Sequence, residues 1–171
     1  MSQRRIAAWL AVVVAIAAAC SDSGTGVEAG AVLEGSFALQ TVDGAPLPIA
    51  QQKSVATDTS GATVFTCTDY LASMQIVVSS GTATRSEAHD LLCDDGINVT
   101  QATFESGKAT RTADGWRLDF TGTDLALSTH YFGRLDGTRL TIVRRETDVM
   151  ISGQVLFPAS VDLSQLVFKR L

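Results

Sequence analysis

The chain is poor in the residues that most active sites and nucleic-acid-binding sites depend on. Among its 171 residues there are two histidines, three cysteines and three prolines, and only three of its 13 basic residues are lysines. A His-rich metal site or a lysine-based active site has little raw material here. The net charge of −5 and the pI near 4.9 argue against a nucleic-acid partner bound through a basic surface. With 46% hydrophobic and 18% charged residues, the chain is too apolar for an intrinsically disordered protein.

Catalytic signatures are also missing. The sequence has no G-x-S-x-G elbow, no H-E-x-x-H pair and no glycine-rich phosphate loop. His89 lies close to Glu87 and Asp90, which gives either an acid–base cluster or a solvated strand end, and we favour the strand end. Asp94-Asp95-Gly96 lacks the spaced carboxylates of a Ca²⁺ loop, so a turn explains it better. We therefore expect a non-enzymatic protein without cofactor or metal.

Only the N-terminus carries a long apolar run. Arg4 and Arg5 precede 14 apolar residues, Ile6 to Ala19. A helix needs roughly 20 residues to cross the hydrocarbon core, so this run is too short to span a membrane. A basic start, an apolar run and small residues at its end are typical of a secretory signal peptide. We predict a signal peptide over residues 1–19.

The end of this segment, Ala17-Ala18-Ala19-Cys20, resembles the lipobox of bacterial lipoproteins, although Leu is more usual at the first of these positions. The resemblance implies that Cys20 becomes the lipid-modified first residue, that residues 20–31 form a flexible tether, and that residues 32–171 form the folded domain. It also implies membrane attachment through the lipid in a bacterial cell envelope, and Ser21 favours the outer membrane. The alternative is an ordinary signal peptide cleaved after Ala19, with Cys20 as an incidental thiol.

With Cys20 assigned to the lipid, Cys67 and Cys93 remain as an even pair, and export places them in an oxidising compartment, where a disulfide is the default expectation. The 25 residues between them, with His89 as the nearby histidine, match no zinc pattern. We predict a structural disulfide.

The body of the chain shows the period of β-strands. Polar-residue–Gly pairs such as Asp43-Gly44 and Asp136-Gly137 predict tight turns, and we place Ser106-Gly107 among them. Between the turns, apolar residues alternate with polar ones, and helical stripes are nearly absent after the signal peptide. Ser86–Leu92 is a candidate helical turn, and Pro158–Gln165 a loop or short helix. The expected core is Phe37, Leu39, Met74, Ile76, Val78, Trp116, Leu118, Phe120, Leu125, Leu127, Leu140, Ile142 and Phe168.

Short strands joined by hairpins predict an all-β fold, a single antiparallel up-and-down barrel, with a sandwich as the alternative. Two segments, Gly35–Pro48 and Leu135–Ile142, resemble small bacterial lipoproteins with a lipocalin-like barrel. Phe37 stands where true lipocalins have the Trp of their G-x-W start. The resemblance supports the barrel more than it supports any ligand.

Arginines gather near the C-terminal end of the chain, at Arg134, Arg139, Arg144 and Arg145, with Arg170 on the last strand. Either they form a site for an anion or a lipid headgroup, or they are solvated side chains that protect strand edges, which is more common. Neighbours on a strand point to opposite faces, so one of Arg144 and Arg145 faces inward and needs a carboxylate such as Asp119 or Asp148.

Two functional hypotheses remain open. In the first, the protein is a lipid-anchored envelope protein whose barrel binds a small hydrophobic ligand. In the second, it is a structural or interaction protein, such as an assembly factor or inhibitor, with a filled barrel or sandwich. An apolar void would favour the first hypothesis and a filled interior the second.

Overall fold

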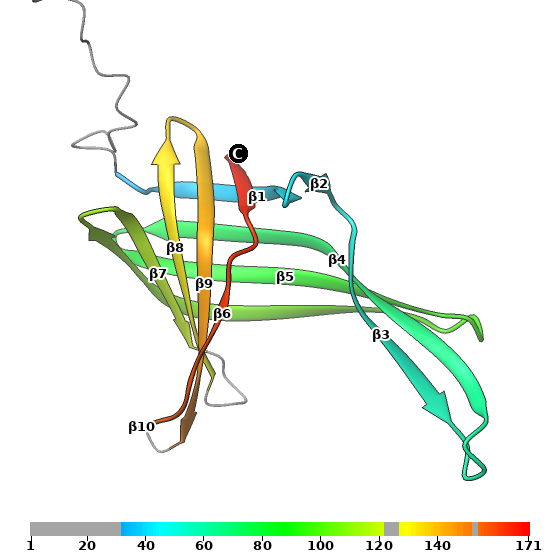
Figure 1. Ribbon diagram of the computed structural model, residues 1–171. Coiled ribbons are helices and arrows are strands. Elements are labelled where there is room, and N and C mark those ends of the chain that lie inside the picture. The colour runs from blue at the N-terminus through cyan, green and yellow to red at the C-terminus, as the bar shows by residue number, and fades with distance from the viewer. Residues whose placement is uncertain (1–31, 122–126, 152–153) are drawn as a thin grey trace, which may run out of the picture.

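The computed structural model describes residues 32–121, 127–151 and 154–171, and within these ranges the chain forms strands and turns without a helix (Figure 1). The all-β prediction is therefore confirmed. The strands are β1 (Gly35–Val42), β2 (Ala45–Pro46), β3 (Ile49–Thr57), β4 (Thr63–Ser79), β5 (Thr82–Cys93), β6 (Asn98–Thr112), β7 (Gly115–Thr121), β8 (Leu127–Asp136), β9 (Arg139–Ile151), β10 (Gln154–Asp162) and β11 (Leu166–Arg170).

Eight antiparallel strands close into an up-and-down barrel, as the sequence predicts. Strands β4 to β9 follow one another as hairpin neighbours, β11 pairs with β9, and β1 joins β11 to β4. A closed ring satisfies the backbone groups that an open sheet would leave at its edges. We call the part where β1 pairs with β11 the closed end.

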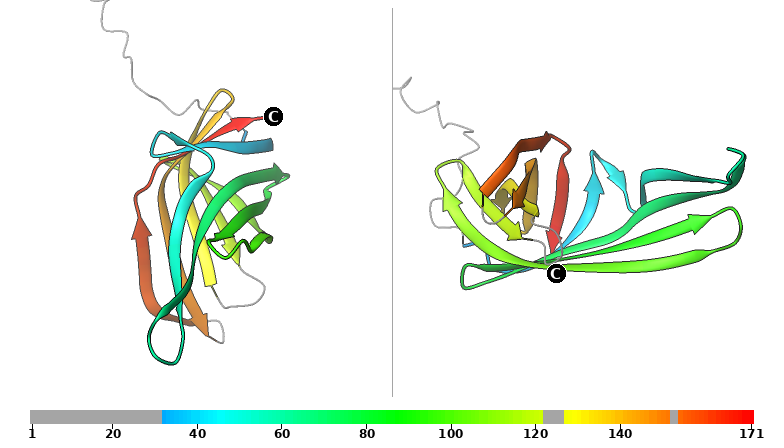
Figure 2. Two further views of the ribbon diagram at one scale, coloured as in Figure 1. Left: turned by 90° about the vertical axis from the view of Figure 1, so that its right-hand side faces the viewer. Right: turned by 90° about the horizontal axis from the view of Figure 1, so that it is seen from below.

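The ring is not closed along its whole length. β4 pairs with β1 over one part of its length and with β3 over the rest. In the same way, β9 pairs first with β11 and then with β10. No pairing joins β3 to β10 in the part of the chain that the structure describes. Figure 1 shows the two halves of the sheet diverging there, and the view from below in Figure 2 shows the long strands β4 to β6 projecting beyond the barrel. We call this part, with the turns at 58–62 and 94–97, the open end.

Two glycines inside strands let the barrel curve tightly. A Cβ on Gly107 would lie 1.8 Å from the backbone oxygen of Asp119 on the neighbouring strand, and a Cβ on Gly133 would lie 2.6 Å from that of Thr141. Only glycine tolerates such close backbone approach. The predicted turn at Ser106-Gly107 is therefore wrong, because Gly107 lies within β6, whose two halves the sequence analysis separated. The Asp43-Gly44 turn is confirmed, with both residues at positive φ.

The core fills the closed end. Of the predicted core residues, all but three are buried; Trp116 and Leu127 are half-buried, and Leu125 lies outside the described residues. Trp116, the second residue of β7, is only half-buried but still packs against the core. The prediction missed several buried residues, namely Leu33, Leu71, Ala83, Tyr131, Leu135 and Leu166.

One local prediction is wrong and another is confirmed only in part. Ser86–Leu92 is not a helical turn but part of β5, whereas of the loop or short helix expected at Pro158–Gln165 only residues 163–165 form a loop, because β10 extends through Asp162. In β5 the polar side chains face inward, which hides the strand period from a hydrophobicity count. The described residues contain no helix long and apolar enough to cross a membrane. The predicted signal peptide (1–19) and tether (20–31) lie outside the described residues.

Candidate functional site

The barrel interior changes from apolar to polar along β5. Successive inward residues of this strand are Ala83, Arg85, Glu87, His89 and Leu91, and the facing residues of β6 include Glu105, Thr103 and Gln101. Ala83 belongs to the apolar core, whereas the residues after it face the open end. A strand crossing the barrel therefore carries a row of charged and polar groups into its interior.

Arg85 forms the boundary between the two environments. Its side chain is buried and bonds the Tyr131 hydroxyl and the Glu105 carboxylate, and it lies 3.2 Å from Glu87. Its guanidinium also lies 5.4 Å from the centre of the Phe120 ring and 5.2 Å from that of Tyr131, which is cation–π distance. The two rings meet edge to face at 5.7 Å. A buried charge is tolerated only with such partners, and Arg85 has several.

Burial affects the two central groups differently. Burial alone would lower the pKa of Arg85, but the nearby Tyr131, Glu87 and Glu105 outweigh it and raise that pKa. Burial raises the pKa of Tyr131, and the positive charge of Arg85 only partly offsets the effect. Both groups therefore keep their protons across the physiological range, with Arg85 charged and Tyr131 neutral.

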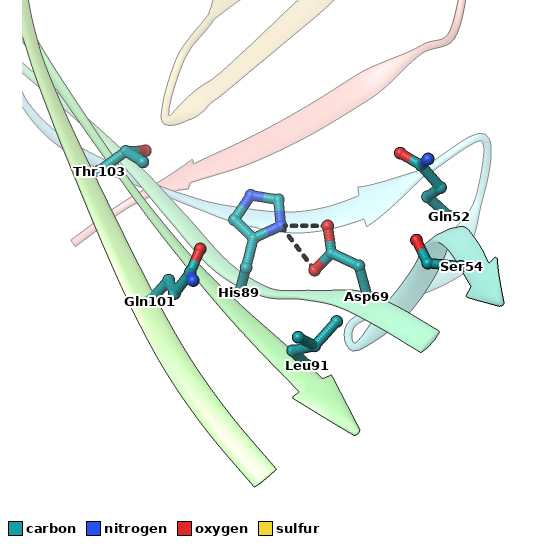
Figure 3. A pocket seen from close by; sticks show the side chains of 7 residues that line it. All are labelled: Gln52, Ser54, Asp69, His89, Leu91, Gln101 and Thr103. Carbon is teal, nitrogen blue, oxygen red and sulfur yellow. Dashed lines mark hydrogen bonds and ion pairs between the residues drawn. The ribbon is translucent and has the colours of Figure 1, made fainter. Parts of the chain in front are cut away.

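Beyond Arg85 the open end holds a pocket of about 340 Å³ (Figure 3). In Figure 3 the His89 ring and the Asp69 carboxylate point toward each other, and Leu91 lies beside them. The His89 Nδ1 atom lies 3.1 and 3.2 Å from the two Asp69 oxygens, and its Nε2 atom lies 3.5 Å from Glu87. The remaining lining residues are Gln52, Ser54, Gln101 and Thr103.

These contacts form one continuous polar chain from the solvent to the core. Asp69 contacts His89, His89 contacts Glu87, and Glu87 contacts Arg85, which bonds Tyr131. An imidazole held by a carboxylate at Nδ1 resembles a general-base arrangement, but its Nε2 faces Glu87 rather than a hydroxyl group. No hydrogen bond between His89 and a serine or threonine hydroxyl is present among the described residues. The arrangement offers carboxylate, imidazole and amide groups with which a polar group could form hydrogen bonds.

The sequence analysis missed this site. It placed His89 at a solvated strand end, whereas the structure places it half-buried inside the barrel mouth, with Asp69 rather than Asp90 as its partner. Asp69 lies distant in sequence and reaches His89 only because β4 pairs with β5. The available signal was the spacing of two residues between Arg85, Glu87 and His89, which puts all three on one face of a strand.

The predicted disulfide is present. Cys67 on β4 and Cys93 on β5 are directly paired across the two strands, and their sulfur atoms lie 1.98 Å apart. The bond joins the two strands near the open end, beside the pocket residue Asp69. Cys20 lies outside the described residues, so its lipidation stays a prediction. No group of three or more His, Cys, Asp or Glu side chains in the described ranges is arranged to hold a metal ion.

The arginine cluster divides between the two faces of the barrel. Arg145 is the inward member of its pair, and its partner is Asp162 at 2.5 Å, not Asp119 or Asp148 as expected. Those two carboxylates instead flank His130, which Asp119 approaches to 2.5 Å. Arg144 faces outward, 4.0 Å from the centre of the Phe132 ring.

No protein-family model, curated protein or solved structure is significantly similar to this chain. The barrel is consistent with the lipocalin-like resemblance of its first strand, while membership of a family is not shown. The function therefore has to be argued from the geometry of the barrel.

Proposed function

We propose that this protein is a non-enzymatic, lipid-anchored binding protein of the bacterial cell envelope that takes a small amphipathic molecule at the open end of its barrel. The observation that carries the proposal is the pocket around Asp69 and His89, which lies where the barrel is open and its interior is polar. Small-molecule sites combine apolar surface with a few convergent polar groups, and this pocket has both.

The pocket favours a ligand with a hydrogen-bond-donating, preferably cationic, head. Asp69 offers carboxylate oxygens and Gln101 offers an amide around a single imidazole, and the Glu87 carboxylate lies 3.5 Å from the Nε2 atom of that imidazole. Leu91 in the pocket gives a short apolar tail a surface to contact. A purely hydrophobic ligand, the form of the hypothesis drawn from sequence, would remove water from the Asp69 carboxylate and leave it with His89 as its polar contact, which costs free energy. We therefore keep the binding barrel and propose an amphipathic ligand.

Two fluorescent probes with opposite heads test this ligand chemistry. Dansylcadaverine has an amine head, and a dansylated fatty acid has a carboxylate head. We expect saturable binding of the amine probe, displaceable by an unlabelled alkylamine, and clearly weaker binding of the fatty acid. Asp69→Asn should weaken the amine probe by roughly tenfold, as expected for the loss of one charged hydrogen bond. Asp90→Asn is the matched control, because Asp90 lies on the outer face of β5 and accepts a bond from Thr100.

Equal binding of both probes, or equal loss in both variants, would contradict the proposed pocket. Stronger binding of the fatty acid than of the amine probe would favour the hydrophobic ligand expected from the sequence. Mass spectrometry of the protein purified from its own host would then identify the natural occupant.

Membrane attachment is tested separately at Cys20. The proposal places the lipid there, because Cys20 directly follows three alanines and precedes a small, polar segment. An alkyne fatty acid supplied to the host should label the wild-type protein and leave Cys20→Ser unlabelled. Equal labelling of both proteins would contradict the lipid anchor at Cys20, and with it the outer-membrane location, and would leave the proposed pocket unaffected.

One observation supports the interaction-protein alternative. Val55, Val64 and Leu92 are exposed on neighbouring strands of the projecting open end, at 55%, 61% and 46% of their full surface. Val55 and Leu92 lie opposite Thr66 and Thr68 of β4, and apolar side chains exposed together in this way are a candidate protein interface. Crosslinking in host cells that captures one partner at this surface, lost in Val55→Lys, would favour that function.

A further inference from the structure

A second groove lies on the outer wall of the barrel, at the junction of β1, β9 and β11. Its volume is about 560 Å³. The lining residues are Gln40, Thr41, Gly44, Thr138, Arg139, Gln165, Val167, Phe168 and Lys169. Two of them are cationic, several can donate hydrogen bonds, and none carries a carboxylate. The groove is thus the reverse in charge of the pocket at the open end.

The two cations of this groove face each other. Arg139 on β9 and Lys169 on β11 are directly paired across the two strands, so their side chains leave the sheet on the same face. Phe168 next to Lys169 points into the core, which places the cationic pair on the outer wall. Like charges directly opposite each other destabilise a sheet unless something neutralises them.

In the described part of the protein, neither of these two cations forms an ion pair with a carboxylate, whereas Arg85, Arg117, Arg144 and Arg145 each have one. Asp43 is close, but one of its carboxylate oxygens accepts the backbone N–H of Gln165. Asp136 pairs across the β8–β9 turn from Arg139 and makes no ion pair with it. The groove therefore combines two unpaired cations with amide and hydroxyl donors.

We propose that this groove binds a phosphate-class anion, held between Arg139 and Lys169. A guanidinium offers forked N–H donors to phosphate oxygens and an ammonium adds a second charge. The anion is either a phosphate on a soluble molecule or the phosphate of a lipid headgroup. The inference does not depend on the amphipathic-ligand pocket, because the two sites share no residue.

A lipid source is sterically available. The β8–β9 turn beside Arg139 lies at the closed end, where residue 32 also enters the barrel and Glu34 accepts the N–H of Ser80. Residues 20–31 can span at most about 40 Å even when fully extended, so a lipid on Cys20 would keep this end near the headgroups. The pocket around His89 would then face away from the membrane.

The test uses the chain from residue 20 with Cys20→Ser, so that no attached lipid contributes. Inorganic phosphate, against chloride at equal ionic strength, should raise the melting temperature in a saturable manner if the groove takes free phosphate. Phosphatidylcholine vesicles containing phosphatidylglycerol should co-sediment the protein, against vesicles without it, if the groove takes headgroups. Arg139→Gln with Lys169→Gln should weaken whichever binding occurs by at least about tenfold, since two charge-assisted interactions are lost.

The matched control is Lys53→Gln with Lys108→Gln, which removes the same charge from exposed positions on β3 and β6, away from the groove. We expect this control to bind like the wild type. Phosphate binding alone identifies a soluble ligand, vesicle binding alone identifies a headgroup, and both support the shared chemistry. Absence of both in the wild type, or equal loss in the control variant, would overturn the proposal. Arg139→Gln alone should also raise the melting temperature without phosphate, a change that a merely structural arginine would not produce.

Discussion

The closed and open ends of the barrel are built from the same long strands but are stabilised in different ways. At the closed end each of the eight strands of the ring has two neighbours, and the interior holds buried side chains such as Phe37, Ile76 and Phe168. At the open end β3 and β10 each pair on one side only, the interior is polar, and a disulfide joins β4 to β5. The buried apolar core thus lies at the closed end, and the proposed binding pocket lies at the open end.

Arg85 makes this division possible within one strand. Its guanidinium closes the apolar core with cation–π contacts on one side and holds Glu87 and Glu105 on the other. Without a buried cation at this level, the carboxylates of the open end would face an apolar layer without a partner. The polar pocket therefore depends on a residue that also belongs to the core.

The largest effect should come from breaking the closed end. Phe168→Ala removes a fully buried ring from β11, so we expect the free energy of unfolding to fall by about 3–5 kcal/mol. Leu92→Ala at the open end is the control, because Leu92 is 46% exposed and should change stability by less than about 0.5 kcal/mol. Urea unfolding of both variants measures the difference. Similar losses would show that the two ends contribute equally.

Arg85→Met breaks the boundary between the two ends. It leaves Glu87 and Glu105 desolvated without a cation, so we expect a loss of about 3 kcal/mol, at the low end of the range for breaking a buried ion pair. Adding Glu105→Gln to Arg85→Met should recover part of this loss, since it removes one unpaired charge. If the double variant is less stable than Arg85→Met by the full cost of Glu105→Gln, the ion pair does not hold the boundary.

Removing the disulfide tests how the open end is stabilised. Cys67→Ala with Cys93→Ala opens a covalent loop with a sequence separation of 26, and we expect a loss of about 2–4 kcal/mol. Hydrogen exchange should show the greatest loss of protection in β4 and β5 near the open end, with the closed end less affected. Uniform loss along both strands would mean that the bond stabilises the whole barrel through the unfolded state alone.

The closed end could be predicted from the sequence because the features that define it can be recognised within a short segment of the chain. Apolar residues that alternate along a strand, such as Leu118 and Phe120, indicate a buried face without knowledge of their partners. Gly-containing turns such as Asp43-Gly44 gave the hairpins for the same reason, since a positive φ is a property of one or two residues. Gly107 shows the limit: its role is a close approach to β7, which no local pattern reveals.

The open end could not be predicted because its polar groups depend on partners that are distant in sequence. His89 is defined by Asp69 on another strand, and Arg145 by Asp162 rather than by either carboxylate proposed for it. An inward row of Arg85, Glu87 and His89 has the period of a strand but not its hydrophobicity. Both pairs lie across neighbouring strands whose register shifts at an irregularity, such as the one between Leu71 and Ser73, and no local pattern reveals these shifts.

The smallest predicted effect concerns stability at acidic pH and the carboxyl group of Asp162, the last residue of β10. The backbone N–H of Ser164 donates to Asp162, and Arg145 lies beside it; together these lower the pKa of the Asp162 carboxyl from its ordinary value of 3.8. A carboxyl with a lowered folded-state pKa stabilises the protein above pH 3.8 and loses that contribution as the pH falls through the folded-state pKa. Asp162→Asn should therefore cost little at pH 7, because the side chain is more than a third exposed, and should flatten the loss of stability below pH 4. Urea unfolding of wild type and variant at a series of acidic pH values measures how the free energy of unfolding changes with pH. Identical slopes would show that Asp162 does not contribute to this pH dependence.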